Sequence, residues 1–240
     1  MIKSTKQCAY CNDTGSLTKE HIWPRSIIKK YEPKLKTYNK RINKFIDGDP
    51  MIKDVCANCN GRILSQLDAY LSALYDRHLY KCLSPGDSTI IEYDYAMLLR
   101  SLLKISYNCA RAAANKKNIK AHKKLARYIL NGKHVSSVQL RLVVVTSANA
   151  VVDGKIIKDA FPVTQLRCAD ISYNGRLSRR FLIRLIAINS FWFYIKISHN
   201  RETKRKWGEF LDGFSAWKLQ SGLLVEPNSH SLHIQADQTT

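Results

Sequence analysis

Four of the seven cysteines stand in two pairs of identical spacing, a pattern typical of metal sites. Cys8 and Cys11 form the first Cys-x2-Cys pair, and Cys56 and Cys59 form the second. Four thiolates complete the tetrahedral coordination that Zn²⁺ adopts in structural sites. Because such a site leaves no open position for water, we expect this zinc to stabilise the fold and to take no part in chemistry. Four unrelated buried thiols are the alternative interpretation.

A single histidine, His21, lies between the two cysteine pairs, in the segment Glu20-His21-Ile22-Trp23-Pro24. If four cysteines hold the zinc, this imidazole is available for another role. Asn60 directly follows the second pair. Each of these residues also has a simpler interpretation. Glu20 and His21 can be an ordinary surface pair, and Asn60 can be the N-cap of a helix, a position that asparagine favours.

Taken together, these motifs resemble the HNH endonucleases, the ββα-metal nucleases that carry a zinc knuckle. The resemblance covers about residues 5–80, a third of the chain, and rests on Cys8-x2-Cys11, Glu20-His21-Ile22-x-Pro24 and Cys56-Ala57-Asn58-Cys59-Asn60. It implies two short strands and a helix around one catalytic Mg²⁺ or Mn²⁺. It further implies that His21 is the general base and that Glu20 and Asn60 hold the ion, which would stabilise the pentacovalent phosphorus and the leaving oxygen.

The sequence departs from the family pattern at two positions. The family usually has an asparagine a few residues before the second knuckle, but residues 51–55 read Met-Ile-Lys-Asp-Val. Asp54, Asn43 and Asn58 are the candidates to orient His21 in its place. Glu20 replaces the more frequent aspartate and still offers a hard oxygen ligand.

The charge of the chain favours a polyanionic partner. Lys and Arg outnumber Asp and Glu by 39 to 19, a net charge of +20, which attracts nucleic acid. Residues 91–200 carry 19 basic and 5 acidic side chains. Within them, residues 111–127 hold seven basic side chains and no acidic one. A solvated basic surface is the alternative. The candidate nucleic-acid-binding residues are Lys120, Lys123, Lys124, Arg127 and, just after the histidine segment, Arg25.

Both helices and strands are expected to position these residues. We expect strands at 18–22 and 51–55, a mainly loop segment at 25–50 with one short helix, and a helix from Asn60, where apolar residues recur every three or four positions. Helices follow at 94–114 and 122–130. Strands are expected at 139–146 and 180–198, a hairpin around Asp153-Gly154, and a helix at 202–219.

This pattern predicts an α+β protein with two domains. Residues 1–85 are expected to form a zinc-stabilised ββα-metal domain, and residues 86–226 a basic domain of helices and antiparallel strands that binds nucleic acid or a partner subunit. Residues 227–240 are expected to be a disordered tail. The polar N-terminus is unlike a signal peptide, and the most apolar run, 185–197, is too short to span a bilayer. We therefore expect a cytoplasmic protein without membrane contact.

The functional prediction is a metal-dependent endonuclease that hydrolyses phosphodiester bonds, with a role in restriction or phage defence. Double-stranded DNA is the expected substrate by analogy with the family, which is a weaker argument than residue chemistry. Two alternatives stay open. The chain can be a zinc-knuckle module that binds nucleic acid without cutting it, or a nuclease subunit that is active only within a complex.

Overall fold

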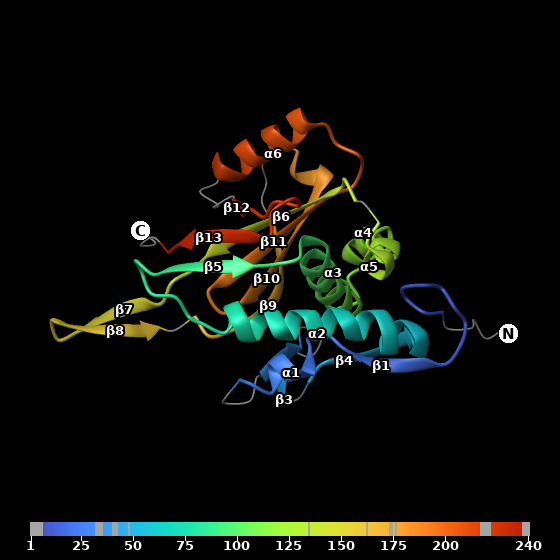
Figure 1. Cartoon of the computed structure of the whole chain (residues 1–240), viewed down its shortest axis with the longest axis horizontal. Helices are drawn as coiled ribbons and strands as arrows, with labels where there is room; N and C mark the ends of the chain where they lie inside the picture. Colours follow the sequence, from blue (N-terminus) through green and yellow to red (C-terminus); the bar gives the residue numbers. More distant parts are fainter. Residues whose placement is uncertain are drawn as a thin grey trace. The chain divides into compact units, whose positions relative to one another are not determined.

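Helices and antiparallel strands alternate along the chain, which confirms the predicted α+β class (Figure 1). The computed structural model describes residues 7–31, 36–39, 43–47, 49–133, 135–161, 163–172, 175, 177–216 and 222–236. The polar N-terminus at 1–6 lies outside these residues. Of the helices in the described ranges, none combines the length and the hydrophobicity that crossing a bilayer requires.

The chain divides into two compact units, each built from two stretches of sequence. One comprises Met1–Ala73 with Ala96–Val135, and the other comprises Leu74–Tyr95 with Ser136–Thr240. This division differs from the expected boundary at residue 85, because the long helix α3 (Tyr95–Ala112) packs with the N-terminal segment. The segment Ser84-Pro85-Gly86-Asp87, at the expected boundary, forms a turn inside the second unit. In this turn Asp87 N–H donates to Ser84 O at 3.1 Å.

The first unit pairs two short strands around the cysteine segments. β1 and β4 are antiparallel, with Leu17 opposite Cys56 and His21 opposite Met51. A bulge between Thr18 and Glu20 shifts the register, and bulges of this kind re-aim side chains. The elements of this unit are β1 (Leu17–His21), α1 (Arg25–Ile28), β2 (Lys36–Asn39), β3 (Lys44–Asp47), β4 (Met51–Cys56), η1 (Cys59–Leu64), α2 (Ser65–Leu74), α3, α4 (Lys116–Lys123) and α5 (Ala126–Asn131).

The helix predicted from Asn60 starts one residue earlier, as a π-helical turn, η1, that continues into α2. Its apolar stripe is buried as its spacing requires, since Leu64, Leu67 and Leu71 are at most 1% exposed. The segment 25–50, expected to be mainly loop, holds α1 and also the antiparallel pair β2–β3. The helix expected at 122–130 is two helices, α4 and α5.

Helix α3 forms the centre of the first unit. It buries apolar residues, among them Leu98, Leu102 and Ile105, at helical spacing. Ser101, Lys104 and Asn108 are also buried. Because residues three and four positions apart lie on one face of a helix, these polar residues form a stripe that needs polar partners in the interior.

The second unit is organised around a five-stranded antiparallel sheet of order β12-β6-β11-β10-β9. Aromatic residues of α6, Phe210 and Phe214, join an apolar cluster with side chains of the sheet. Lys196 of β11 is also fully buried, with its Nζ 4.5 Å from the ring centre of Phe214. The elements are η2 (Tyr75–Leu79), β5 (Ser88–Glu92), β6 (Val138–Val144), β7 (Ala148–Val152), β8 (Lys155–Phe161), β9 (Leu166–Ile171), η3 (Ser178–Arg180), β10 (Phe181–Ile188), β11 (Phe191–Ser198), α6 (Lys204–Ala216), β12 (Leu223–Leu224) and β13 (Ser231–Gln235).

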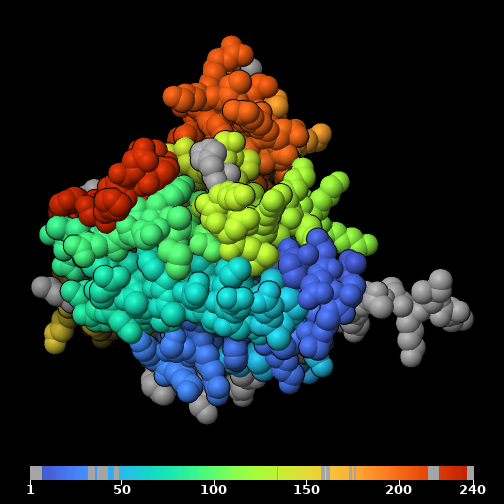
Figure 2. All heavy atoms as spheres, turned by 45° about the vertical axis from the view of Figure 1, so that its right-hand side comes forward, coloured from blue at the N-terminus to red at the C-terminus, as the bar shows by residue number. Residues whose placement is uncertain are grey.

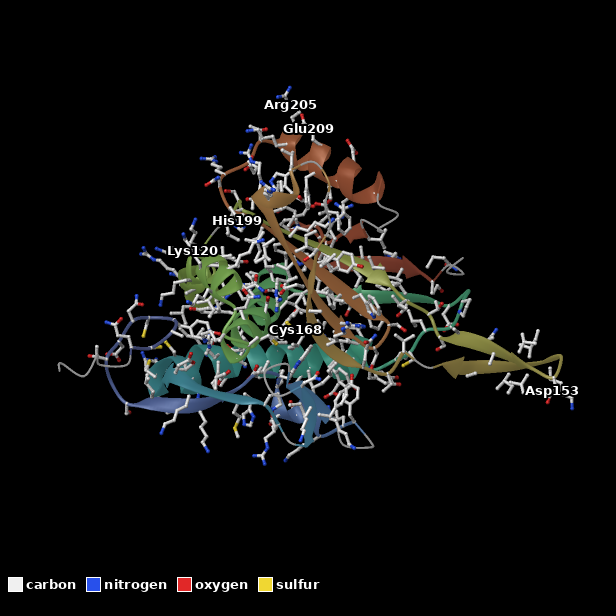
Figure 3. All side chains as sticks on the ribbon, turned by 180° about the vertical axis from the view of Figure 1, so that it is seen from behind. Lys120, Asp153, Cys168, His199, Arg205 and Glu209 are labelled. Carbon is white, nitrogen blue, oxygen red and sulfur yellow. The ribbon has the colours of Figure 1, made fainter. Side chains whose placement is uncertain are left out.

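Three sequence expectations for this unit have clear outcomes. The hairpin at Asp153-Gly154 is confirmed: β7 and β8 pair across it, both turn residues have positive φ (51° and 74°), and Figure 3 shows Asp153 at its tip. The helix expected at 202–219 ends at Ala216, and residues 217–219 lie outside the described ranges. The tail from residue 227 was expected to be disordered, but β13 pairs with β5 in it; residues 237–240 are not described.

Candidate active site

The four cysteines that the spacing singled out come together at one end of the β1–β4 pair. Their Sγ atoms all lie within 4.8 Å of one another, close enough to bind one metal ion. Cys8, Cys56 and Cys59 are buried, and Cys11 is exposed. Two thiolate positions are stabilised by backbone donors, since Cys56 N–H donates to Cys8 Sγ at 3.4 Å and Cys59 N–H to Cys56 Sγ at 3.5 Å. This donor set fits a structural zinc ion.

The cysteines differ in how readily they ionise. Burial raises the pKa of Cys8, but backbone donors from Cys11, Cys56 and Tyr10 outweigh it and lower that pKa to about 7. Burial and the neighbouring thiols raise the pKa of Cys59. A metal ion that binds all four must therefore displace protons, so metal binding to this cluster depends on pH.

Asn60 fastens the start of the helix to the first strand. Its side-chain Nδ2 donates to Thr18 Oγ1 at 2.8 Å and to the Lys19 carbonyl oxygen at 2.9 Å. The Lys19 contact falls on the bulge of β1. These bonds give Asn60 a structural role in the register of β1. The N-cap position itself is taken by Asn58, which has no side-chain capping bond.

His21 is oriented by a carboxylate that the sequence did not single out. Its Nδ1 lies 2.6 Å from Asp49 Oδ2, and its side chain is 30% exposed. A carboxylate this close to Nδ1 favours the tautomer with the proton on Nδ1, which leaves on Nε2 the lone pair that a general base needs. Asp49 is brought there by the strand register, because His21 pairs with Met51 and Ile22 N–H donates to Pro50 O at 3.0 Å.

The carboxylate of Asp49 is itself tuned by its surroundings. Burial raises the pKa of Asp49, while His21, Arg25 and Lys104 lower it. Arg25, the predicted phosphate ligand at the start of α1, is exposed and lies near enough to Asp49 to contribute to this balance. Arg25 therefore acts electrostatically on the carboxylate that contacts His21.

Glu20 contacts a lysine from α3. Its carboxylate is buried, with Oε1 2.5 Å from Nζ of Lys104, and this lysine is 0% exposed. Lys104 Nζ also donates to Asp68 Oδ1 and Oδ2 at 2.7 and 2.8 Å and to the His21 carbonyl oxygen at 3.4 Å. One buried ammonium thus pairs with two carboxylates and contacts the backbone of the histidine.

A second α3 side chain completes this support. Asn108 Nδ2 donates to the His21 carbonyl oxygen at 3.0 Å. Asn108 Oδ1 in turn accepts from Tyr10 Oη at 2.7 Å and from Arg111 at 2.8 Å. Tyr10 belongs to the first cysteine segment, so the knuckle, the helix and the histidine share one hydrogen-bond network.

The three residues expected to orient His21 in place of the missing asparagine have other contacts or are exposed. Asp54 pairs with Arg111 at 2.9 Å. Asn43 and Asn58 are exposed, and Asn58 is the N-cap residue of η1. The contact with His21 is made by Asp49. Asp49 lies just before β4, the strand that pairs with the histidine strand. An acidic residue at such a position is the signal that could have identified it.

Glu20 is not placed to hold the divalent ion that the resemblance implies, and the Nδ2 of Asn60 is held by β1. A hard cation needs open carboxylate oxygens, but Glu20 is buried against the Lys104 ammonium and Asn60 is hydrogen-bonded to β1. Across the described ranges, no group of three or more His, Cys, Asp and Glu side chains other than the four cysteines is placed to hold an ion.

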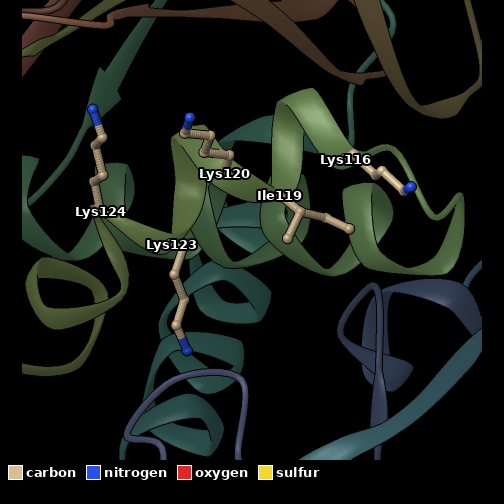
Figure 4. A pocket seen from close by; sticks show the side chains of 5 residues that line it. All are labelled: Lys116, Ile119, Lys120, Lys123 and Lys124. Atoms are coloured by element: carbon tan, nitrogen blue, oxygen red, sulfur yellow. The ribbon is translucent and has the colours of Figure 1, made fainter.

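The basic segment expected to bind nucleic acid forms an exposed face on α4. Lys116, Lys120, Lys123 and Lys124 surround Ile119 in a shallow hollow (Figure 4), and Figure 3 shows Lys120 on the outside of the helix. Lys123 has a structural contact, because its Nζ donates to Ala9 O at 2.7 Å and to Asn12 Oδ1 at 2.6 Å. The α4 surface therefore adjoins the cysteine segment, as Figure 2 also shows. Arg127, on α5, is exposed.

Comparison with known proteins gives no match: no family model, no curated protein and no solved structure is similar to this chain.

Proposed function

We propose that the chain is an endonuclease of the HNH type that hydrolyses phosphodiester bonds in nucleic acid. The observation that carries the proposal is the pairing of His21 Nδ1 with Asp49 Oδ2 at 2.6 Å, on a strand pair closed by a four-cysteine cluster and followed by a helix. A partly exposed histidine whose Nδ1 faces a carboxylate is suited to accept a proton at Nε2.

In the proposed reaction, Nε2 of His21 takes a proton from water, and the resulting oxygen attacks phosphorus. The phosphorus–oxygen bond to one sugar then breaks, and the leaving oxygen takes a proton from solvent. Asp49 stabilises the imidazolium that forms. Arg25 is proposed to bind a non-bridging phosphate oxygen, since it is exposed and lies near the pair. The resemblance implies a divalent ion in this reaction, but Glu20, which is buried against the Lys104 ammonium, does not fit one.

Nucleic acid is the proposed substrate because of charge. The chain has a net charge of +20, and the exposed lysines of α4 lie beside the cysteine segment in the unit that holds His21. Such a surface binds phosphates without reading sequence. Double-stranded DNA stays the proposed form by family analogy alone. The second unit is proposed to bind nucleic acid or a partner subunit, and restriction or phage defence is the proposed role.

The decisive experiment incubates the purified, zinc-loaded chain with supercoiled plasmid, single-stranded DNA and RNA, each with Mg²⁺, with Mn²⁺ and without added metal. The test variant is His21→Ala, and the matched control is His230→Ala, a histidine exposed in the second unit. We expect cleavage by wild type and control, and a loss of about 100-fold or more in His21→Ala, the usual contribution of a general base. Zinc content and binding affinity should not change. Cleavage by His21→Ala at the wild-type rate would remove His21 from the mechanism.

A second candidate is a zinc-knuckle module that binds nucleic acid without cutting it. It is favoured by the structural contacts of the two expected metal ligands, since Asn60 fastens β1 and Glu20 pairs with Lys104. The same experiment separates the two candidates. Salt-dependent binding with no strand breaks under any metal condition, alone or with a partner subunit supplied, supports the binding module.

A further inference from the structure

Lys104 occupies the place where a metal-dependent site would need its cation. Its ammonium is fully buried, 2.5 Å from Glu20 Oε1 and 2.7 and 2.8 Å from the two oxygens of Asp68, and it reaches the His21 carbonyl at 3.4 Å. We propose that Lys104 is the resident cation of this site, so that the carboxylates of Glu20 and Asp68 take no divalent ion. This proposal concerns the site assigned above, but it can be tested whether or not the chain cuts nucleic acid.

The charges around His21 are balanced by side chains alone. Three carboxylates, Glu20, Asp49 and Asp68, act on one another or on His21. Two permanent cations, Lys104 and Arg25, act on Asp49, and Lys104 also pairs with Glu20 and Asp68. With neutral His21 the group carries one net negative charge, and the imidazolium brings it to neutrality. The charged side chains of the cluster therefore balance one another to within one unit of charge without a metal ion.

A divalent ion would disturb this balance. Added to the cluster with Lys104 in place, it would leave an excess positive charge in a buried setting, where charge interactions are strong. It would also have to compete with an ammonium that already contacts an oxygen of Glu20 and both oxygens of Asp68. If Lys104 loses its charge, the same two carboxylates become neighbours without a counter-ion, and such a pair of hard oxygen donors suits Mg²⁺ or Mn²⁺.

The proposal makes opposite predictions for the wild type and for Lys104→Met, which keeps a long side chain and removes the ammonium. Binding of Mn²⁺ by the full-length, zinc-loaded chain is followed by electron paramagnetic resonance, and thermal unfolding is measured with and without millimolar Mn²⁺. For the wild type we expect no Mn²⁺ bound at Glu20, so that Glu20→Gln and the wild type give the same Mn²⁺ binding. We also expect no rise in the melting temperature of the wild type with Mn²⁺. For Lys104→Met we expect one bound Mn²⁺ and a rise of several degrees, because a ligand that binds only the folded state stabilises it.

A double variant controls for misfolding. In Lys104→Met with Glu20→Gln, one carboxylate is neutralised together with the lysine, and we expect this variant to fold and to show no response to Mn²⁺. The proposal is overturned if the wild type binds one Mn²⁺ that is lost in Glu20→Gln, a result that needs no Lys104 variant. It is equally overturned if a folded Lys104→Met gains no Mn²⁺ site. Cleavage assays are separate: a chain that cuts nothing refutes the nuclease proposal and leaves these metal-binding results standing.

Discussion

Asp49 Oδ2 lies 2.6 Å from Nδ1 of His21. If this contact sets the tautomer, Asp49→Asn should lower the cleavage rate by about 10-fold or more without changing zinc content, because an amide cannot stabilise the imidazolium in the same way. The rate is compared with that of Asp153→Asn, at the tip of the β7–β8 hairpin. An Asp49→Asn protein as active as the wild type would show that the contact does not contribute to catalysis.

The four-cysteine cluster should bind one zinc ion that the first unit needs in order to fold. Cys8→Ser or Cys59→Ser should remove that zinc and unfold the unit, because structural zinc contributes roughly 10 kcal/mol or more to folding. Cys109→Ser, outside the cluster, is the control. Metal analysis of the purified proteins and circular dichroism give the answer, and a wild-type protein that contains no zinc contradicts the prediction.

Asn60 should act on stability, not on metal. Its Nδ2 makes two hydrogen bonds to β1, so Asn60→Ala should lower the free energy of unfolding by about 1–3 kcal/mol. Asn58→Ala, an exposed position that takes no part in these bonds, should have little effect. Denaturant titrations measure the difference. Unchanged stability together with a changed requirement for Mg²⁺ or Mn²⁺ would instead favour the metal-ligand role that the resemblance implies.

The basic face of α4 should carry part of the salt dependence of nucleic-acid binding. Lys116→Glu with Lys120→Glu should weaken binding to all sequences and make the log–log salt slope shallower, by roughly 0.9 for each phosphate of duplex DNA that the variant no longer neutralises. Lys123 is avoided, because reversing it would break its bonds to Ala9 and Asn12. The control with the same charge change is Arg201→Glu with Lys204→Glu, both exposed. A slope and an affinity in Lys116→Glu with Lys120→Glu that equal those of the wild type would exclude α4 as a phosphate-binding face.

Lys196 should make the stability of the second unit depend on pH. Burial, with a contribution from Arg141, lowers the pKa of Lys196 from its ordinary value of 10.5 to about 7. Between pH 7 and pH 10.5 the Lys196 side chain is protonated in the unfolded chain and neutral in the folded chain. Because the unfolded state binds more protons across this range, stability should rise with pH. Below pH 7 both states are protonated, and the folded state bears the full cost of a buried ammonium.

Lys196→Met should therefore stabilise the unit at pH 6.5 by about 1 kcal/mol or more and flatten the rise towards pH 9. Lys204→Met, at an exposed position, is the control. Chemical denaturation at several pH values measures both effects. If wild type and Lys196→Met follow parallel pH profiles, the lysine is not neutral in the folded chain.

Local signals in the sequence predicted much of the first unit. The Cys-x2-Cys spacings identified the cluster, and β1, β4 and the helix after Cys59 lie close to their expected positions. The partners of the candidate site could not be predicted in the same way. The periodicity of α3 was interpreted through its apolar face, whereas Lys104 and Asn108 act from its polar stripe, whose partners are distant in sequence. The role of Asp49 could not be predicted from the sequence, because it depends on the register between two strands.

Each unit is built from two separate stretches of sequence, which has a consequence for truncated fragments and for folding during synthesis. A fragment ending at residue 85 would lack α3, and with it the ammonium that compensates Glu20 and both side chains that hold the His21 carbonyl. During synthesis, β5 has to wait for β13, the last of the described strands, before it gains its partner. Because contacts between such distant segments slow folding, nascent chains should expose the edge of β5 until β13 has been synthesised.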